Sequence, residues 1–272
     1  MKSCDTSFKP ICPFEIKTRY IEIASESPDS VFDSHIHEEC EIYINLSGDV
    51  SFVVEDSIYP IVPGSIIITR PFEYHHCVYH SNKIHKHFWI LFSTSGNEYL
   101  LDAFYNRKTG KNNLLMLTPE KTKEIISVCT EMADERGSDL ENYYRFFKLI
   151  SLLHDADTPN YSDSTYPDDV VNAIKYINEN LSNHLTIAEI SRAVNVSINT
   201  LERHFMSVLN ISPAAYSRKK RLSSAVKLLS EGCSVTEASE KSGFPDYSGF
   251  IALFKKTYGQ TPLAYKKSRD SR

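Results

Sequence analysis

The sequence predicts a two-domain protein, in which an all-β N-terminal barrel with two trailing helices is followed by an all-α C-terminal domain. Three observations support this prediction. Short β-type runs fill residues 14–92, helical periods fill most of the chain after residue 119, and residues 185–265 hold two copies of one short helical unit. A chain of 272 residues is long enough for two domains, each with its own core.

The charge of the chain is divided unevenly between its two parts. Residues 168–272 contain 15 Lys and Arg against 10 Asp and Glu, which gives +5, whereas residues 1–167 contain 15 against 25, which gives −10. A basic domain suits contact with phosphates, and an acidic partner domain limits indiscriminate adhesion to nucleic acid. The alternative is an uneven surface whose charges only face solvent.

The N-terminal part is predicted to be β because its apolar runs are short, rich in Val, Ile, Tyr and Phe, and separated by turn signals. The expected strands are residues 16–23, 31–37, 41–46, 50–54, 58–62, 65–69 and 87–92. Short strands at such regular spacing indicate a sandwich or a barrel, which protects its own edges by closing.

Two fragments rich in histidine lie within this β region. The first contains His35, His37, Glu41 and Gly48, and the second contains Gly64, Pro71, His75 and His76. They resemble the two motifs of the cupin barrel, in which two His, one Glu and a later His can converge on a metal. The second fragment departs from the cupin pattern, because Glu73 stands at the usual position of a Gly.

The cupin resemblance leaves two interpretations of these side chains. We expect them to line the pocket of a small-molecule effector, without a cofactor, and the candidates are His35, His37, Glu41, Tyr43, His75 and His76. The alternative is a metal site made of His35, His37, Glu41 and His76, with His75 competing for the last position.

Three further features of the β region need a separate interpretation. Cys40 and Cys77 flank the histidine motifs, so they are either part of a thiolate or redox-sensitive site or small buried hydrophobes. Strand alternation places His85 and His87 on one face with Trp89. We interpret this face as packing rather than as a ligand site.

Two amphipathic helices are expected after the β region, at residues 119–133 and 140–154. They either cover the open side of the barrel or mediate dimerisation. Residues 155–167 are polar and contain two prolines, which is typical of a linker. The predicted domains are therefore residues 1–154, a linker at 155–167, and residues 168–272.

The C-terminal part contains two predicted helix-turn-helix units, at residues 185–205 and 233–254. Each is followed by a similar tail, at residues 210–216 and 259–265, with Pro and Tyr in register. A first helix at 168–181 precedes them. A long helix at about 213–230 begins with Pro213, at a position where the backbone N–H that proline lacks would have no partner within the helix. This helix would hold the two units at a fixed separation.

These repeated motifs resemble the DNA-binding domain of AraC/XylS transcription regulators. The residues that carry the resemblance are Leu201, Phe205, Ser212, Pro213, Tyr216, Arg221, Leu222, Ala225, Leu228, Leu229, Gly243, Phe244, Phe250, Phe254, Lys255, Lys256, Thr261, Pro262 and Tyr265. The sequence departs from the family at Met206, where Lys is usual, and at Ala238, where a larger aliphatic residue is usual.

The resemblance implies a ligand-responsive, sequence-specific transcription regulator that activates metabolic genes, and genes for carbohydrate use are the candidates. Its implied partners are double-stranded DNA, a small effector, RNA polymerase if the protein is an activator, and a second copy bound through helices 119–154. The rival hypothesis is a metal-dependent cupin enzyme with an appended helical domain.

Exposed positions near the start of each second helix are the expected base contacts. In the first unit they are Asn199, Thr200, Glu202 and Arg203, and in the second Tyr247, Ser248 and Ile251. Phosphate contacts are expected from His204, Arg218, Lys255 and Lys256, and the neighbouring Lys219, Lys220 and Arg221 are assigned to phosphates or to the solvated surface. Because Ile251 cannot make paired hydrogen bonds, we expect the first unit to carry most of the base selectivity.

The composition also bears on the compartment. The six cysteines are scattered, the N-terminus has no apolar run, and no stretch approaches the roughly 18 apolar residues of a membrane span. We therefore expect a cytoplasmic protein without a membrane partner.

Overall fold

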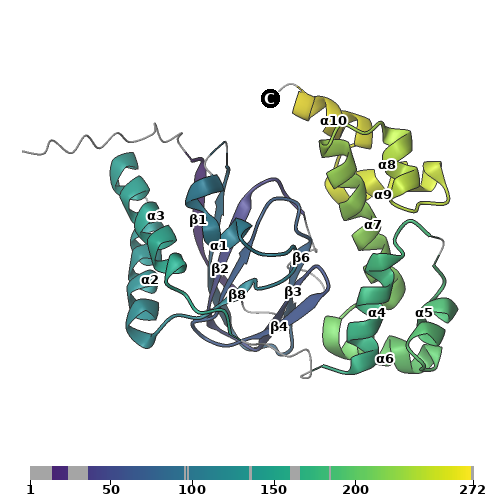
Figure 1. Ribbon diagram of the computed structural model, residues 1–272, viewed down its shortest axis with the longest axis horizontal. Coiled ribbons are helices and arrows are strands. Elements are labelled where there is room, and N and C mark those ends of the chain that lie inside the picture. The colour runs from purple at the N-terminus through teal and green to yellow at the C-terminus, as the bar shows by residue number, and fades with distance from the viewer. Residues whose placement is uncertain are drawn as a thin grey trace, which may run out of the picture.

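The computed structural model describes residues 14–23, 36–94, 96, 98–134, 137–159, 166–183 and 185–270. Figure 1 shows the strands in the middle of the molecule, with α2 and α3 on one side and α4 to α10 on the other. The predicted order of an N-terminal β domain and a C-terminal helical domain is confirmed.

The strands form two antiparallel sheets. The five-stranded sheet has the order β1 (Ile16–Ile23), β7 (His85–Phe92), β2 (Cys40–Ser47), β5 (Ile66–Thr69), β8 (Leu114–Leu115). The three-stranded sheet has the order β4 (Ser57–Ile61), β3 (Val50–Val54), β6 (His75–Tyr79). Among the described residues no strand pairs across the two sheets, so the expected closed barrel is replaced by two facing sheets. Residues 31–35 of one expected strand lie outside the described part of the chain.

Strand alternation divides the side chains of the β domain between two cores. Ile42 and Ile44 of β2 face outward and pack against Phe146 and Leu149 of the flanking helices. Tyr43, which lies between them in sequence, faces the interior between the sheets. Both faces of the strand are therefore buried, which explains why the sequence runs are almost continuously apolar.

The two helices after the β domain are α2 (Pro119–Met132) and α3 (Asp139–His154), preceded by η1 (Glu98–Leu100) and α1 (Asp102–Tyr105). The Thr118 side chain caps α2, and Ser138 caps α3 in a capping box with Glu141. They cover the outer face of the five-stranded sheet. An isolated bridge from Met116 to Asp157 then ties the chain after α3 back to the sheet edge.

The C-terminal domain consists of seven helices in its described residues. They are α4 (Asp168–Glu179), α5 (Ile187–Ala193), α6 (Ile198–Leu209), α7 (Pro213–Ser230), α8 (Val235–Lys241), α9 (Tyr247–Tyr258) and α10 (Pro262–Asp270). Helices α5 and α6 form the first helix-turn-helix unit, and α8 and α9 form the second. None of the helices in the described residues is long and apolar enough to cross a membrane.

The two units use matching local devices. Capping boxes open α5 at Thr186 and α8 at Ser234, and the turns that follow these helices contain residues with positive φ, Asn195 at 58° and Gly243 at 81°. A Cβ at Gly243 would lie 2.0 Å from the Leu181 carbonyl oxygen, so a close backbone approach also requires glycine there.

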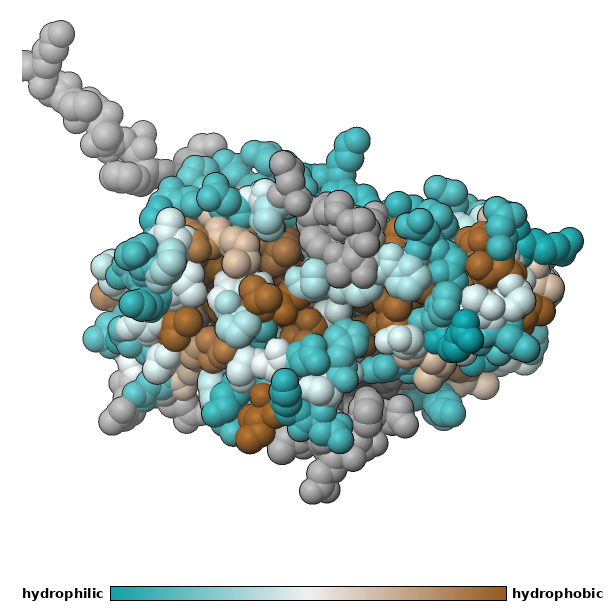
Figure 2. Space-filling view, turned by 90° about the horizontal axis from the view of Figure 1, so that it is seen from below, coloured by the Kyte–Doolittle hydropathy of each residue, from teal (hydrophilic) through white to brown (hydrophobic). Residues whose placement is uncertain are grey.

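The two domains pack against each other through the outer face of the three-stranded sheet. Val53 of β3 and Tyr74, the residue before β6, share a core with Phe205 of α6 and Tyr216 of α7. On the face shown in Figure 2, hydrophobic residues are scattered over both domains between hydrophilic ones and do not form one continuous band.

Candidate effector pocket and DNA-binding surface

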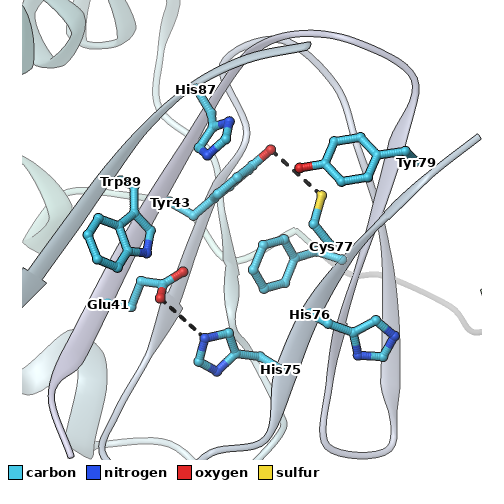
Figure 3. Close-up of a pocket in the computed structure, with 9 residues that line it drawn as sticks. Glu41, Tyr43, His75, His76, Cys77, Tyr79, His87 and Trp89 are labelled. Carbon is cyan, nitrogen blue, oxygen red and sulfur yellow. Dashed lines mark hydrogen bonds and ion pairs between the residues drawn. The ribbon is translucent and has the colours of Figure 1, made fainter. Parts of the chain in front are cut away.

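A cavity of about 70 Å³ lies between the two sheets of the β domain (Figure 3). Strands β2, β3, β6 and β7 supply its walls. The lining residues are Glu41, Tyr43, Phe52, His75, His76, Cys77, Tyr79, His87 and Trp89. The cavity therefore contains a carboxylate, several neutral polar groups and several aromatic faces, which suits a small polar ligand.

The sequence left the last position of the histidine cluster open between His76, which the motif spacing favoured, and its competitor His75, and the structure brings His75 to Glu41. Along β6, His75, Cys77 and Tyr79 face the cavity, whereas His76 lies opposite Val53 and its ring packs edge-on against Tyr74 at 5.6 Å. Figure 3 shows His75 directed toward Glu41 and His76 directed away from it. The motif spacing was misleading because a shift of one residue moves a side chain to the other face of a strand.

His37, Glu41 and His75 form one cluster at the wall of the cavity. Glu41 Oε2 lies 3.1 Å from His37 Nε2 and 3.2 Å from His75 Nε2. Glu41 and His75 are 3% and 1% exposed, so both are shielded from solvent. The expected fourth member, His35, lies outside the described residues.

Glu73, the residue that departs from the cupin pattern, forms a buried ion pair behind His75. Arg107 Nη2 lies 2.5 Å from Glu73 Oε2, and the Gly110 amide donates to Glu73 Oε1 at 2.9 Å. Burial alone would raise the pKa of Glu73, but the hydrogen bonds and charge of Arg107 outweigh it and lower the pKa. This pair fixes the backbone that positions His75.

His85 and His87 form a stack with Tyr43 on the wall that the five-stranded sheet supplies. The Tyr43 hydroxyl lies 2.7 Å from His85 Nε2, and the rings of His85 and His87 are 4.8 Å apart. Burial lowers the pKa of His87 to about 3, so this imidazole is neutral. The packing role predicted for this face is accompanied by a second role, because His87 and Trp89 also line the cavity. Trp89 pairs with Tyr43, and alternation along β7 from Trp89 to His87 could have identified both residues.

The two cysteines beside the histidine motifs lie on opposite faces of the β domain. Cys40 is fully buried in the core under α2 and α3, and burial raises its pKa to about 12. Cys77 lines the cavity, 3.9 Å from the Tyr43 hydroxyl, and burial likewise raises its pKa to about 12. Both side chains are therefore neutral thiols in this arrangement, not thiolates.

The second helix of the first unit, α6, exposes Asn199, Glu202 and Arg203. Thr200 is half-buried, and its hydroxyl lies 2.8 Å from the hydroxyl of the capping residue Ser197. His204 Nδ1 lies 2.8 Å from an Asp169 carboxylate oxygen on α4. The structure therefore commits this imidazole to a contact between helices, in addition to any phosphate contact.

The equivalent helix of the second unit, α9, exposes Tyr247 and Ser248 at its start, where Asp246 caps it. Ile251 is half-buried against the core of this unit. Arg218, Lys255 and Lys256 are exposed, as a phosphate contact requires.

Lys220 and Arg221 are buried, which contradicts their assignment to phosphates or to the solvated surface. Lys220 is 4% exposed and forms an ion pair with Glu55 of the β domain. Arg221 is 8% exposed and donates to the carbonyl oxygens of Leu181 and Asn183. Both side chains stabilise the packing of α7.

Comparison with known proteins agrees with this architecture. The family described as the AraC-like ligand binding domain matches residues 21–150, and a helix-turn-helix domain family matches residues 190–268. The transcriptional activator RhaS of Mannheimia succiniciproducens is 23% identical over 257 residues, which cover 92% of this chain and 94% of RhaS.

Two other relatives match over shorter stretches of the chain. The uncharacterized regulator YdeC of Bacillus subtilis is 36% identical over 84 residues, which cover 30% of this chain and 29% of YdeC. The xylose operon regulatory protein of Escherichia coli is 30% identical over 98 residues, which cover 36% of this chain and 25% of that protein. With a ligand-binding domain joined to a double helix-turn-helix domain, the chain belongs to the AraC/XylS family of DNA-binding transcription regulators.

Proposed function

We propose that this regulator activates genes for carbohydrate use and that its effector binds in the cavity beside Glu41 and His75. The observation that carries the proposal is an alternation along the chain. Residues whose side chains line the cavity are followed or preceded directly by residues that contact the DNA-binding domain. Two relatives support the gene class, since one is named a transcriptional activator and another a xylose operon regulatory protein.

The chemistry of the cavity suits an uncharged, hydroxyl-rich molecule. The Glu41 carboxylate can accept hydrogen bonds from hydroxyl groups, and the Tyr43 hydroxyl offers a neutral polar partner. Phe52 and Trp89 provide apolar faces on which a sugar ring can pack. A negatively charged effector would find no Lys or Arg side chain among the lining residues.

The size of the cavity implies that it changes when a ring-sized effector binds. Its volume of about 70 Å³ is smaller than the roughly 150 Å³ of an engineered cavity that binds benzene. Side chains on the wall, including His75, must therefore shift to admit such a molecule. An effector that binds only the widened state will bias the protein toward it.

Movement of His75 would reach the DNA-binding domain through the preceding residue. Tyr74 faces the other way, and its ring lies 4.6 Å from the Lys220 ammonium and 6.0 Å from the Tyr216 ring on α7. The Tyr74 amide donates to the Glu55 carboxylate at 2.8 Å, and Glu55 also pairs with Lys220. A change at the cavity wall is thus one residue away from the anchor of α7.

Three further contacts connect residues in or beside the cavity to the reading domain. Glu38 follows His37 and lies 3.1 Å from the Tyr265 hydroxyl and 3.0 Å from Arg269, both on α10. Tyr79 lines the cavity with its side chain, while its carbonyl oxygen accepts from Asn210 at the end of α6. The β domain therefore holds both helix-turn-helix units.

For DNA reading, we infer that Asn199, Glu202 and Arg203 of the first unit supply most of the base selectivity. Tyr247 and Ser248 of the second unit add weaker contacts, while Arg218, Lys255 and Lys256 bind phosphates. Thr200, His204 and Ile251 are secondary candidates, because the structure already engages these side chains in capping or packing.

Dimerisation and recruitment of RNA polymerase complete the proposed mechanism. On α3, Leu140 and Tyr144 are 80% and 69% exposed and lie one helical turn apart. Apolar side chains this exposed favour a second copy as the partner.

Trp89 offers a direct test, because it is the only tryptophan of the chain and lines the cavity. Titration with a panel of monosaccharides should change its fluorescence saturably for at least one sugar, and Glu41→Gln should abolish the change. The same sugar should alter the affinity of the full chain for DNA upstream of sugar-use genes, measured by fluorescence anisotropy. A panel without any saturable response, or a response that leaves DNA binding unchanged, would contradict the proposal.

A further inference from the structure

Met206 is an apolar residue of α6 that lies outside the core of the first helix-turn-helix unit. The buried side of this helix consists of Leu201, Phe205, Val208 and Leu209. Met206 is 49% exposed, whereas Phe205 beside it is fully buried. Single exposed apolar residues are common on protein surfaces, so exposure alone gives Met206 no role. Its place on the helix decides the question.

Met206 lies in the middle of the exposed face of α6. Each residue turns an α-helix by about 100°, so the seven residues from Asn199 to Met206 make almost two full turns and leave these two side chains about 20° apart. Glu202 and Arg203 lie one turn earlier, and all four residues are exposed. These four residues form one continuous surface, which we call the reading face of α6.

The second helix-turn-helix unit carries a different group at the equivalent position. Helices α6 and α9 both have 12 residues, both begin after a side-chain cap, and both end at a left-handed residue. Met206 follows the buried Phe205 as the exposed Lys255 follows the buried Phe254. A lysine suits a phosphate contact, whereas the thioether of methionine has neither a charge nor a hydrogen-bond donor. The two units therefore offer DNA different chemistry at this position.

We propose that Met206 contacts the methyl group of a thymine, so that the first unit reads a base where the second unit binds a phosphate. This inference rests on the proposed reading of bases by Asn199, Glu202 and Arg203. In the major groove, thymine presents a C5-methyl group, and apolar side chains contact it. A methionine side chain is unbranched and flexible, so it can fit against this methyl group beside the polar contacts of its neighbours.

The length of α6 predicts where this thymine lies in the DNA site. The seven residues from Asn199 to Met206 advance about 10.5 Å along the helix axis, at about 1.5 Å per residue. Successive base pairs are about 3.4 Å apart. The thymine should therefore lie about three base pairs from the pair that Asn199 contacts, with the pair read by Arg203 between them.

Replacement of single thymines by deoxyuridine tests the contact, because deoxyuridine pairs like thymine and lacks only the methyl group. The full chain first selects a preferred duplex from a random library, and fluorescence anisotropy then measures its affinity for each single replacement. We expect the replacement at one thymine to weaken binding about threefold to fivefold, the effect of about one buried methylene group. This thymine should lie about three base pairs from the pair at which Asn199→Ala relaxes the preference.

Met206→Ala should bind the unmodified duplex about threefold to fivefold more weakly and should no longer distinguish thymine from deoxyuridine. Met206→Lys should also lose the methyl preference, and its binding should depend on salt by about one ion more. Lys255→Ala is the matched control, because it should depend on salt by about one ion less and keep the deoxyuridine effect. Thermal unfolding of Met206→Ala should match that of the parent chain, since Met206 is exposed.

Three results would overturn the inference. A deoxyuridine effect that persists in Met206→Ala would assign the methyl contact to another residue. An equal loss on every duplex would make Met206 a contact to the DNA backbone. Unchanged binding by Met206→Ala would leave the exposed methionine to a protein partner. Relaxed base preference in Arg203→Ala beside any of these results would keep the proposed reading by the first unit, whereas unchanged preference in the variants of Asn199, Glu202 and Arg203 would contradict that proposal itself.

Discussion

Lys220 of α7 and Glu55 of the turn between β3 and β4 form an ion pair that joins the DNA-binding domain to the ligand-binding domain. The Lys220 side chain is 5% exposed and that of Glu55 is 22% exposed. The backbone carbonyl oxygen of Glu55 also accepts a hydrogen bond from the Tyr216 hydroxyl, at 3.0 Å. One residue of the β domain therefore holds two residues of α7, one helical turn apart.

Lys220→Met should destabilise the full chain by about 1–3 kcal/mol, because it leaves a partly buried carboxylate without its cation. In urea denaturation, the double variant with Glu55→Gln should lose less stability than the sum of the losses of the two single variants. The effector should also alter DNA binding less in Lys220→Met. Additive stability losses would show that the pair does not couple the two domains.

Arg203→Ala should weaken binding to the preferred DNA site by about 1–3 kcal/mol and relax the preference at one base pair. Arg218→Ala is the matched comparison, because it should weaken binding equally on all sequences and reduce the salt dependence by about one ion. Fluorescence anisotropy on single-base variants of the site separates the two. A uniform loss for Arg203→Ala would make it a phosphate contact.

Gly243→Ala should cost roughly 3 kcal/mol or more in the free energy of unfolding. The added Cβ would combine a strained φ of 81° with a 2.0 Å contact to the Leu181 carbonyl oxygen. Gly232→Ala provides the control, since its φ is 93° but no atom lies within 4 Å, and it should cost about 1 kcal/mol. Equal costs at both positions would refute the close contact.

The stability of the protein should decrease in acid because of His87. Burial lowers the pKa of this residue to about 3, whereas a histidine in the unfolded chain titrates near 6.5. Below about pH 6.5 the unfolded chain binds a proton that the folded chain excludes, so stability falls by up to about 1.4 kcal/mol per pH unit. Urea denaturation between about pH 7 and about pH 5 measures how the free energy of unfolding changes with pH, and this change should be smaller for His87→Gln.

Tyr144→Asp should weaken self-association if α3 forms the dimer interface. Tyr144 is 69% exposed, so an added charge costs little in the monomer but must be desolvated at an interface. Sedimentation velocity across a concentration series measures the effect, and unchanged thermal unfolding at low concentration is the control. A dimer that survives both Tyr144→Asp and Leu140→Glu forms through another surface.

The order of domains and most of the elements could be predicted because their signals are local. Capping at Ser197 and Asp246, and the helical periods that follow, fix the helix-turn-helix units within a few residues. The β runs were equally clear. The predicted closure of the barrel was wrong for the described residues, because pairing between the sheets depends on contacts that the sequence of a single strand does not encode.

The candidate site was predicted only in part. Glu41 and His37 were correctly brought together, but the register of β6, which decides between His75 and His76, was read from motif spacing rather than from alternation. Lys220 and Arg221 looked like a solvated basic run. Their burial depends on packing of α7 against the β domain and against the chain near Leu181, which no local pattern shows.

The 18 residues of α7 also set the angle between the two helix-turn-helix units. Each helical residue turns the chain by about 100° and advances it by about 1.5 Å, so one inserted residue would rotate the second unit by slightly more than a quarter turn about the axis of α7. Tyr216 and Lys220 hold the first half of the helix to the β domain, so the rotation would fall entirely on α8 and α9. We therefore expect a one-residue insertion after Lys220 to separate the two units from a common face of DNA while every base-contacting side chain stays intact.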